Sequence, residues 1–211
     1  GDVNSLPKTV GGAWVHADMK APRFAAFDFR LGTLLGDVPG ASFADWPLDY
    51  DELEPFYAAA ERMIGVQGEA GADPFAEPRS GPYPMKSGVP MYVANVLSEG
   101  ARKLGLHPFP YPAAVTSQTY RGRQACNDCG FCSGYGCPIN AKGSVALLRD
   151  ALLTGNVQVR YNTIATRLAT DASGRRVTAI EYLAPAGKPA SVSGDRVLLA
   201  ASPIESARLL F

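Results

Sequence analysis

Residues 125–144 read ACNDCGFCSGYGCPINAKGS and hold every cysteine of the 211-residue chain. The spacing is C-x2-C-x2-C-x4-C, and Pro138 follows the last thiol. A C-x-x-C step lets two sulfur atoms turn toward a common centre, so consecutive steps can surround one ligand. The four thiols are therefore predicted to form one site, and they are Cys126, Cys129, Cys132 and Cys137.

Three interpretations of this site are open. The first is an iron–sulfur cluster, because the bacterial ferredoxin pattern C-x2-C-x2-C-x3-C-P differs from this stretch by one residue in the last gap. The second is zinc, although zinc sites usually place a long loop between two C-x2-C pairs, and here the pairs run together. The third is structural: buried free thiols, or two disulfides, that pack a glycine-rich loop.

The composition is that of a globular protein. The chain is 46% hydrophobic and 19% charged, and its 20 basic and 20 acidic side chains balance. No basic field is present to attract nucleic acid, and no apolar run approaches the ~18 residues of a membrane helix. The start has no signal-peptide pattern and reads as an interior segment. Any export signal would precede Gly1, so the compartment, cytoplasmic or periplasmic, stays unknown.

A helix is predicted over Asp49–Gly65. Asp49 and Glu52 fit a capping box at its start, and Gly65 is a natural stop. Apolar residues recur along it at helical spacing and predict a stripe that faces the core. The stripe consists of Phe56, Ala59, Ala60, Met63 and Ile64.

Two further helices are predicted, at Tyr92–Leu104 and at Lys142–Leu153. Residues 66–91 are rich in proline and glycine, which predicts a long surface loop. Residues 1–46 show no sustained periodicity and are predicted to be mainly extended.

From residue 156 the pattern changes to short strands. Four are predicted, VQVRYN, TIATRLAT, RVTAIEYL and SVSGDRVLLAA, with hairpin turns at Asp171–Gly174 and Pro185–Gly187. Val197–Ala201 is nearly all apolar, as in a sheet buried on both faces. Ser202 then caps a helix whose free N–H groups suit a phosphate or dinucleotide. These elements predict an α/β fold.

Six stretches, in order along the chain, resemble the glucose-methanol-choline (GMC) flavoprotein oxidoreductases, and most closely the bacterial branch of sugar and gluconate dehydrogenases. They are GGAWVHADMKAPRFAAFDFRLG, DWPLDYDELEPFYAAAERMIGV, GPYPMK, RQACNDCGFCSGYGCPINAKGS, NVQVRYNTIATRLATDASGRRVTAIEYL and VLLAASPIESARLLF. The resemblance covers nearly the whole chain. It implies a flavin-binding GMC-type fold, FAD as cofactor, and oxidation of a CH–OH group of a sugar or alcohol by hydride transfer to flavin.

The resemblance also implies which residues contact FAD. In the family, the stretch around the glycine pair runs past the flavin, the TIATRLAT strand contacts the adenine end, and the LLAASPIE turn approaches the dinucleotide from the other side. The expected contacts are Gly11, Gly12, His16, Ala165, Ala201 and Ser202.

In some members of this branch the cysteine stretch binds an iron–sulfur cluster. The resemblance thus implies a 3Fe–4S or 4Fe–4S cluster on the four thiols, passing electrons to a cytochrome or quinone. One alternative is a non-catalytic iron–sulfur electron-transfer module that does not bind flavin. Another is an oxidase-like relative whose cysteines are structural.

Four regions are expected. They are a flavin-adjacent extended segment at 1–46, helices and loops of a cap or substrate domain at 47–124, the cysteine loop at 125–144, and FAD-domain strands with a closing helix at 145–211. The family's G-x-G-x-x-G turn and its catalytic histidine do not occur in these residues, so no catalytic residue is assigned. We expect an internal fragment that is inactive alone and exposes apolar surface where the rest of such an enzyme docks.

Overall fold

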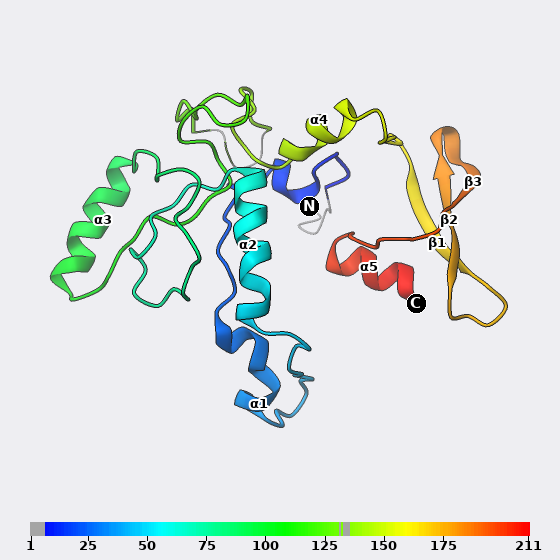
Figure 1. Ribbon diagram of the computed structural model, residues 1–211, viewed down its shortest axis with the longest axis horizontal. Coiled ribbons are helices and arrows are strands. Elements are labelled where there is room, and N and C mark those ends of the chain that lie inside the picture. The colour runs from blue at the N-terminus through cyan, green and yellow to red at the C-terminus, as the bar shows by residue number, and fades with distance from the viewer. Residues whose placement is uncertain (1–6, 131, 133–135) are drawn as a thin grey trace, which may run out of the picture. The chain divides into compact units, whose positions relative to one another are not determined.

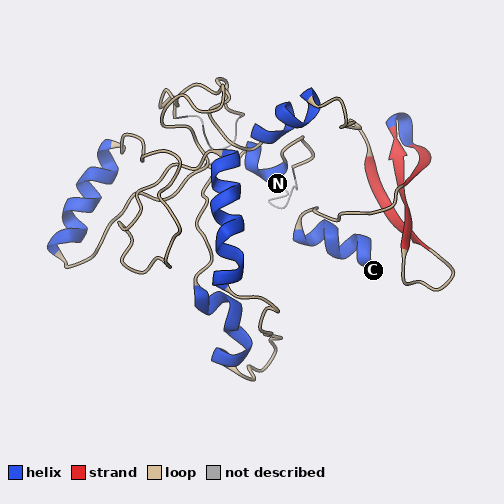
Figure 2. Ribbon diagram, viewed as in Figure 1, coloured by secondary structure: helices blue, strands red, loops and turns tan. Residues whose placement is uncertain are grey.

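The structure is a computed structural model that describes residues 7–130, 132 and 136–211 (Figure 1). It divides into two compact units, Gly1–Gly155 and Asn156–Phe211. The helical elements of the first unit are η1 (Gly12–Val15), η2 (Ala26–Arg30), α1 (Leu31–Leu35), α2 (Tyr50–Ile64), α3 (Tyr92–Lys103) and α4 (Ala146–Leu153). The second unit contains β1 (Ile164–Thr170), β2 (Val177–Ala184), η3 (Pro185–Gly187), β3 (Lys188–Ser193) and α5 (Pro203–Leu210). Within the described residues, every strand lies in the second unit (Figure 2).

The helix predicted over Asp49–Gly65 is confirmed as α2. The Asp49 carboxylate accepts the Glu52 backbone N–H at 3.0 Å, and the Glu52 carboxylate accepts the Asp49 N–H at 3.0 Å. Gly65 ends the helix with a φ of 82°. Both ends of α2 are thus fixed by contacts between residues that are close in sequence.

Only part of the predicted apolar stripe of α2 faces the core, where Ile64 packs and Ala59 is half-buried. Phe56 is 69% exposed and Met63 is 48% exposed, whereas the buried residues of the helix are Tyr50, Ala58 and Glu61. The prediction is wrong for Phe56 and Met63, because two arginines from outside the helix form ion pairs with its acidic face and cover that face instead. A buried carboxylate has to be paired, so these contacts decide which face of α2 is enclosed.

The predicted second helix is confirmed as α3, and residues 66–91 form the predicted loop without a helix or strand. The apolar residues of α3 are exposed, and Val93 and Leu97 keep 55% and 68% of their surface. No helix in the described part of the chain has the length and apolar character that crossing a bilayer requires.

Two predicted boundaries change. Helix α4 begins at Ala146, four residues later than predicted, because Lys142 forms a β-bridge with Val115 and the Gly143 N–H donates to the Ala114 carbonyl at 2.7 Å. The segment 1–46, predicted to be mainly extended, contains the short helical elements η1, η2 and α1. Each is only four or five residues long, which is too short to give a clear periodic sequence pattern.

The hydrophobic core of the first unit lies beside the cysteine stretch. It consists of Met19, Val66, Ala114, Val115 and Ala141, with Cys126, Cys137 and Ile139 packed against it. Segments that are far apart in the sequence therefore meet at the base of the cysteine loop.

The second unit is built on an antiparallel sheet of order β1-β2-β3. Both predicted hairpin turns are confirmed, and the Asp171 N–H donates to the Arg176 carbonyl at 2.9 Å across the first. The predicted strands at 157–162 and Val197–Ala201 do not form, and Leu198 is 91% exposed. A strand needs a ladder partner, and none of residues 156–211 pairs with either segment. The mixed helix-and-strand class is confirmed.

Candidate functional site

The cysteine loop is closed at its base by backbone hydrogen bonds. The Thr116 N–H donates to the Ala141 carbonyl at 3.0 Å, and the Cys126 N–H donates to the Thr116 carbonyl at 2.7 Å. The buried Thr116 hydroxyl donates to the Gln124 carbonyl at 2.5 Å. Thr116 thus joins the chain entering the loop to the chain leaving it, next to the core.

All four sequence-predicted thiols line one small cavity of about 10 Å³. They are free thiols, so the two-disulfide alternative is not what this structure contains. Within the residues that the structure describes, no group of three or more His, Cys, Asp or Glu side chains has an arrangement that could hold a metal ion. The loop brings its thiols together around a space that has room for about one water molecule.

Backbone N–H groups point at two of the sulfur atoms. The Asp128 N–H donates to Cys126 Sγ at 3.4 Å, and the Ala141 N–H donates to Cys137 Sγ at 3.3 Å. Burial raises the pKa of the Cys126 thiol. Burial acts in the same direction on Cys137, but N–H groups and the charge of Lys142 outweigh it and lower the pKa of that thiol. The two ends of the loop thus offer different environments to a thiolate.

The two glycines expected at the flavin have different surroundings. A Cβ on Gly11 would lie 2.7 Å from Val15 Cγ2 and 3.0 Å from Val145 Cγ1, so Gly11 is needed for packing within the chain. Gly12 has a φ of 58°, and a Cβ there would meet no atom of the described residues within 4 Å. The backbone at Gly12 is therefore open to close approach by a ligand. His16 is half-buried at the end of η1.

The three other expected FAD contacts lie in the second unit. The Ala165 carbonyl accepts Arg208 Nη2 at 2.8 Å, where a register shift interrupts the pairing of β1 with β2. Ser202 caps α5, as predicted, and its hydroxyl accepts the Glu205 N–H at 3.3 Å. Ala201 is exposed in the turn before it. Arg208 thus holds α5 against β1.

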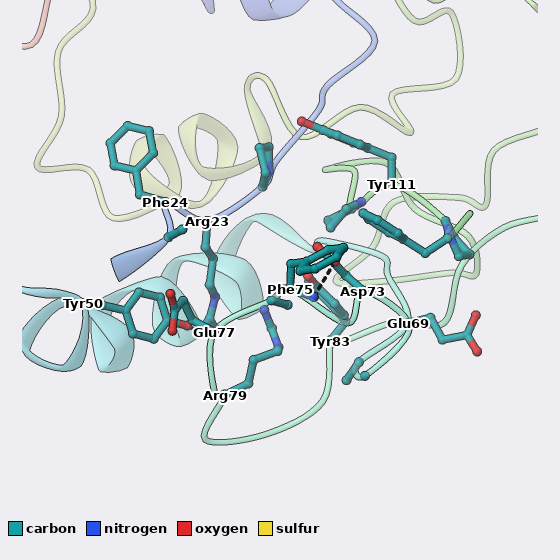
Figure 3. Close-up of a pocket in the computed structure, with 18 residues that line it drawn as sticks. Arg23, Phe24, Tyr50, Glu69, Asp73, Phe75, Glu77, Arg79, Tyr83 and Tyr111 are labelled. Carbon is teal, nitrogen blue, oxygen red and sulfur yellow. Dashed lines mark hydrogen bonds between the residues drawn. The ribbon is translucent and has the colours of Figure 1, made fainter. Parts of the chain in front are cut away.

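A pocket in the first unit was missed by the sequence analysis. It has a volume of about 200 Å³, and Figure 3 shows arginine, tyrosine and phenylalanine side chains around it. Arg23 and Arg79 both donate to Glu61, at 2.9 Å and 2.5 Å, and the Arg79 guanidinium lies 3.7 Å from the centre of the Tyr83 ring. Arg23 also donates to Glu54 at 2.8 Å. The partners are 18 to 38 residues apart, so no local pattern marks them.

A family model described as GMC oxidoreductase matches residues 44–211, which is most of the chain. The chain belongs to the GMC oxidoreductase family. The family resemblance drawn from the six sequence stretches is therefore confirmed.

Curated proteins resemble this GMC chain over most of its length. It is 30% identical to a gluconate 2-dehydrogenase flavoprotein of Pantoea cypripedii, over 81% of this chain and 31% of that protein. It is 33% identical to a fructose dehydrogenase large subunit of Gluconobacter japonicus, over 96% of this chain and 36% of that protein. It is 32% identical to a 6'''-hydroxyparomomycin C oxidase of Streptomyces lividus, over 95% of this chain and 36% of that protein. The chain thus spans about a third of the length of these relatives.

GMC oxidoreductases bind FAD, and the residues of this GMC chain can be compared with that requirement. The open backbone at Gly12 fits a flavin contact, whereas the space beside Gly11 is filled by the chain itself. The Ser202 hydroxyl is used by the α5 cap, which leaves the backbone of that turn for a ligand. Three of the six expected contacts lie in the first unit and three in the second, and each set is described within its own unit.

Proposed function

We propose that this chain is part of a FAD-dependent GMC oxidoreductase that oxidises CH–OH groups of sugars or alcohols. The observation that carries the proposal is the family match over residues 44–211. Two relatives are named as dehydrogenases of gluconate and fructose, which supports a sugar-type substrate. When bound, FAD would supply hydride acceptance from the carbinol carbon. The whole protein's activity remains a proposal because the chain spans about a third of those relatives.

The residues proposed to hold FAD are Gly11, Gly12, His16, Ala165, Ala201 and Ser202. Gly12 is proposed to let the backbone approach the flavin, since no atom of the residues that the structure describes lies within 4 Å of a Cβ at that position. Neither histidine of the chain is proposed as the base that removes the hydroxyl proton. The proposed regions are a flavin-adjacent segment at 1–46, part of a cap or substrate domain at 47–124, the cysteine loop at 125–144 and part of the FAD domain at 145–211.

The cysteine loop is proposed to hold a 3Fe–4S or 4Fe–4S cluster. Four free thiols line one cavity and backbone N–H groups reach two of the sulfur atoms, so the donors match a cluster in type, but as described they do not form an arrangement that holds a metal ion. Hydrogen bonds to the sulfurs are one of the features that tune such clusters. When bound, a cluster would supply one-electron transfer onward to a cytochrome or quinone. Its ligands would be Cys126, Cys129, Cys132 and Cys137.

Two other functions are distinguishable. The chain could belong to an iron–sulfur electron-transfer protein without flavin chemistry, or to an oxidase whose thiols are structural. The oxidase alternative is favoured by one observation. A relative whose match covers 95% of this chain is named as an oxidase. Flavin, iron and sulfide content of the complete protein separate the three possibilities.

The test uses the complete protein, produced and purified without air. We expect FAD and three or four iron atoms per molecule, and alcohol- or sugar-dependent bleaching of the flavin. Cys132→Ser should lose most of the iron and keep the FAD. Asn127→Ser, an exposed change in the same loop that leaves all four thiols, should retain both. FAD without iron in the wild-type protein would contradict the cluster and support the oxidase-like alternative. Iron without FAD would contradict the flavin enzyme and support the electron-transfer module.

A further inference from the structure

The pocket around Arg23 and Arg79 in the first unit lies outside the residues proposed to hold FAD or a cluster. Its volume of about 200 Å³ is smaller than the roughly 300–1,000 Å³ of pockets for drug-sized ligands, so it suits a small molecule. Much of its lining comes from residues 69–83, inside the long loop that follows α2. Loops of this length without secondary structure are commonly functional. The pocket is therefore a good place for a further ligand.

The arginine side of this pocket carries no net charge. The side chains of Arg23 and Arg79 are almost fully buried, and both form ion pairs with the buried carboxylate of Glu61. Arg23 also forms an ion pair with Glu54 at 2.8 Å. Two positive charges are thus balanced by two negative charges, and the four paired side chains hold this side of the pocket in place. A ligand finds no unpaired positive charge here.

Aromatic rings on the pocket lining are open to solvent. Phe75 is 83% exposed, and Phe109 and Tyr111 are exposed as well. Rings left uncovered beside a cavity can contact the carbon skeleton of a ligand, and their faces attract cations. The Tyr111 ring already attracts one cation of the chain, because Lys20 Nζ lies 5.8 Å from the ring centre. The rings therefore suit a ligand with a positive charge and an apolar body.

Asp73 places a negative charge next to these rings. It is half-buried, and its Oδ1 accepts the Phe75 N–H at 2.9 Å, which fixes the carboxylate beside the ring (Figure 3). Within the described part of the chain, no cationic side chain forms an ion pair with Asp73, and its Oδ2 accepts no hydrogen bond. The other carboxylates of the lining, Glu69 and Glu77, likewise form no ion pair with a described residue. The unbalanced charge of the lining is therefore negative, which attracts cations.

We propose that this pocket binds a small organic amine in its ammonium form. The Asp73 carboxylate accepts an N–H of the ammonium group in a charge-assisted hydrogen bond. The rings of Phe75, Phe109 and Tyr111 contact the carbon skeleton of the amine. The arginines stay paired with their glutamates and keep the pocket open. Binding forms no covalent bond and requires neither flavin nor the cysteine loop.

The experiment is isothermal titration calorimetry of the complete, purified protein with benzylamine at pH 7. Benzamide is the neutral counterpart, with the same ring and a similar shape. We expect benzylamine to bind about tenfold more tightly, because a hydrogen bond to a charged group is stronger than one between neutral groups. Asp73→Asn keeps an acceptor for the Phe75 N–H and should weaken benzylamine binding about tenfold. Glu99→Gln, which removes an exposed acid of α3 outside the lining, should leave the affinity unchanged.

A second variant guards against a misfolded Asp73→Asn protein. Phe75→Ala removes an exposed ring away from the arginine ion pairs, so it should fold and bind benzylamine about threefold more weakly. Equal affinity for benzylamine and benzamide, or no binding of benzylamine, would overturn the inference. Wild-type affinity in both pocket variants would also overturn it. Weaker binding in Asp73→Asn alone would support the ammonium site and remove the Phe75 ring from it.

Discussion

Glu61 in the first unit and Glu181 in the second are both held by arginine, but in opposite surroundings. Glu61 binds Arg23 and Arg79, and all three side chains are 8–9% exposed. Glu181 binds Arg167 through two N–H donors at 2.5 Å and 2.9 Å, with side-chain exposures of 39% and 65%. The chain therefore contains one Glu–Arg ion-pair cluster inside a packed unit and one Glu–Arg pair exposed to water, where ion pairs contribute little to stability.

The contrast extends to the whole of each unit. The first unit encloses a core that reaches from Met19 to Ala141, whereas none of residues 156–211 is buried. The second unit is held by its sheet ladder, its turns and the contact of Arg208 with β1. We infer that substitutions of matched chemistry will affect the first unit much more strongly than the second.

The largest effect is expected for Glu61→Ala. Removing this carboxylate leaves two buried guanidinium groups without their shared partner, and breaking such a buried pair costs about 3–5 kcal/mol. The matched change Glu181→Ala should leave stability unchanged within error, because its pair is exposed to water. Urea denaturation of both variants measures the difference. Equal losses in the two variants would remove the distinction between the units.

A smaller effect is expected for Gly143→Ala. The new methyl group would lie 2.5 Å from Ile64 Cγ2 and 3.1 Å from the Ala114 carbonyl, and such overpacking costs about 1–3 kcal/mol. Gly100→Ala is the control, because it lies in α3 and no atom of the described part of the chain is within 4 Å of the new methyl group. That change should stabilise the helix by up to about 1 kcal/mol. Thermal melts of the two variants should shift in opposite directions.

The smallest effect is expected in the pH dependence of stability. A hydrogen bond from the Ser80 N–H and one from Arg23 lower the pKa of Glu54 from 4.5 to about 2. Because this pKa is depressed on folding, its contribution is complete above pH 4.5 and is lost as the pH falls toward 2. Glu54→Gln should flatten the stability profile in that window.

Added salt separates Glu54 from the exposed carboxylate at Glu181. The pKa of Glu181 is also lowered, by its hydrogen bonds with Arg167. Because salt screens exposed charges more than buried ones, 1 M salt should remove any effect of Glu181→Gln and keep that of Glu54→Gln. Urea midpoints between pH 2 and 5 at two salt concentrations test this. If 1 M salt abolished the effect of Glu54→Gln on stability, the Glu54 carboxylate would be screened by salt as strongly as the exposed Glu181 carboxylate.

Features that depend on neighbouring residues could be predicted from the sequence. The Asp49–Glu52 capping box, the Ser202 cap and the turn at Asp171–Gly174 each join residues that are three apart, and all three form. The gathering of the four thiols likewise follows from their spacing, although it does not by itself produce a metal-binding arrangement among the described residues.

Features that depend on distant partners could not be predicted. Arg23 and Glu61 are 38 residues apart, and Lys142 is 127 residues from Val15, so no periodicity marks either contact. The ion pairs of α2 enclose Glu61, whereas Phe56 and Met63 of the predicted apolar stripe stay exposed. Val197–Ala201 has the composition of an enclosed strand, but composition does not supply the partner whose hydrogen bonds make a strand.

The contact between Arg208 and β1 has a consequence for solubility. The outer strands of a small sheet can recruit strands from other molecules and grow into aggregates. Here the guanidinium group of Arg208 occupies the carbonyls of Ala165 and Thr166, beside an interruption in the pairing of β1. On the opposite border, β3 starts with Lys188 and Pro189, a charge followed by a residue without an N–H. Both borders of the sheet thus carry features that oppose edge-to-edge pairing.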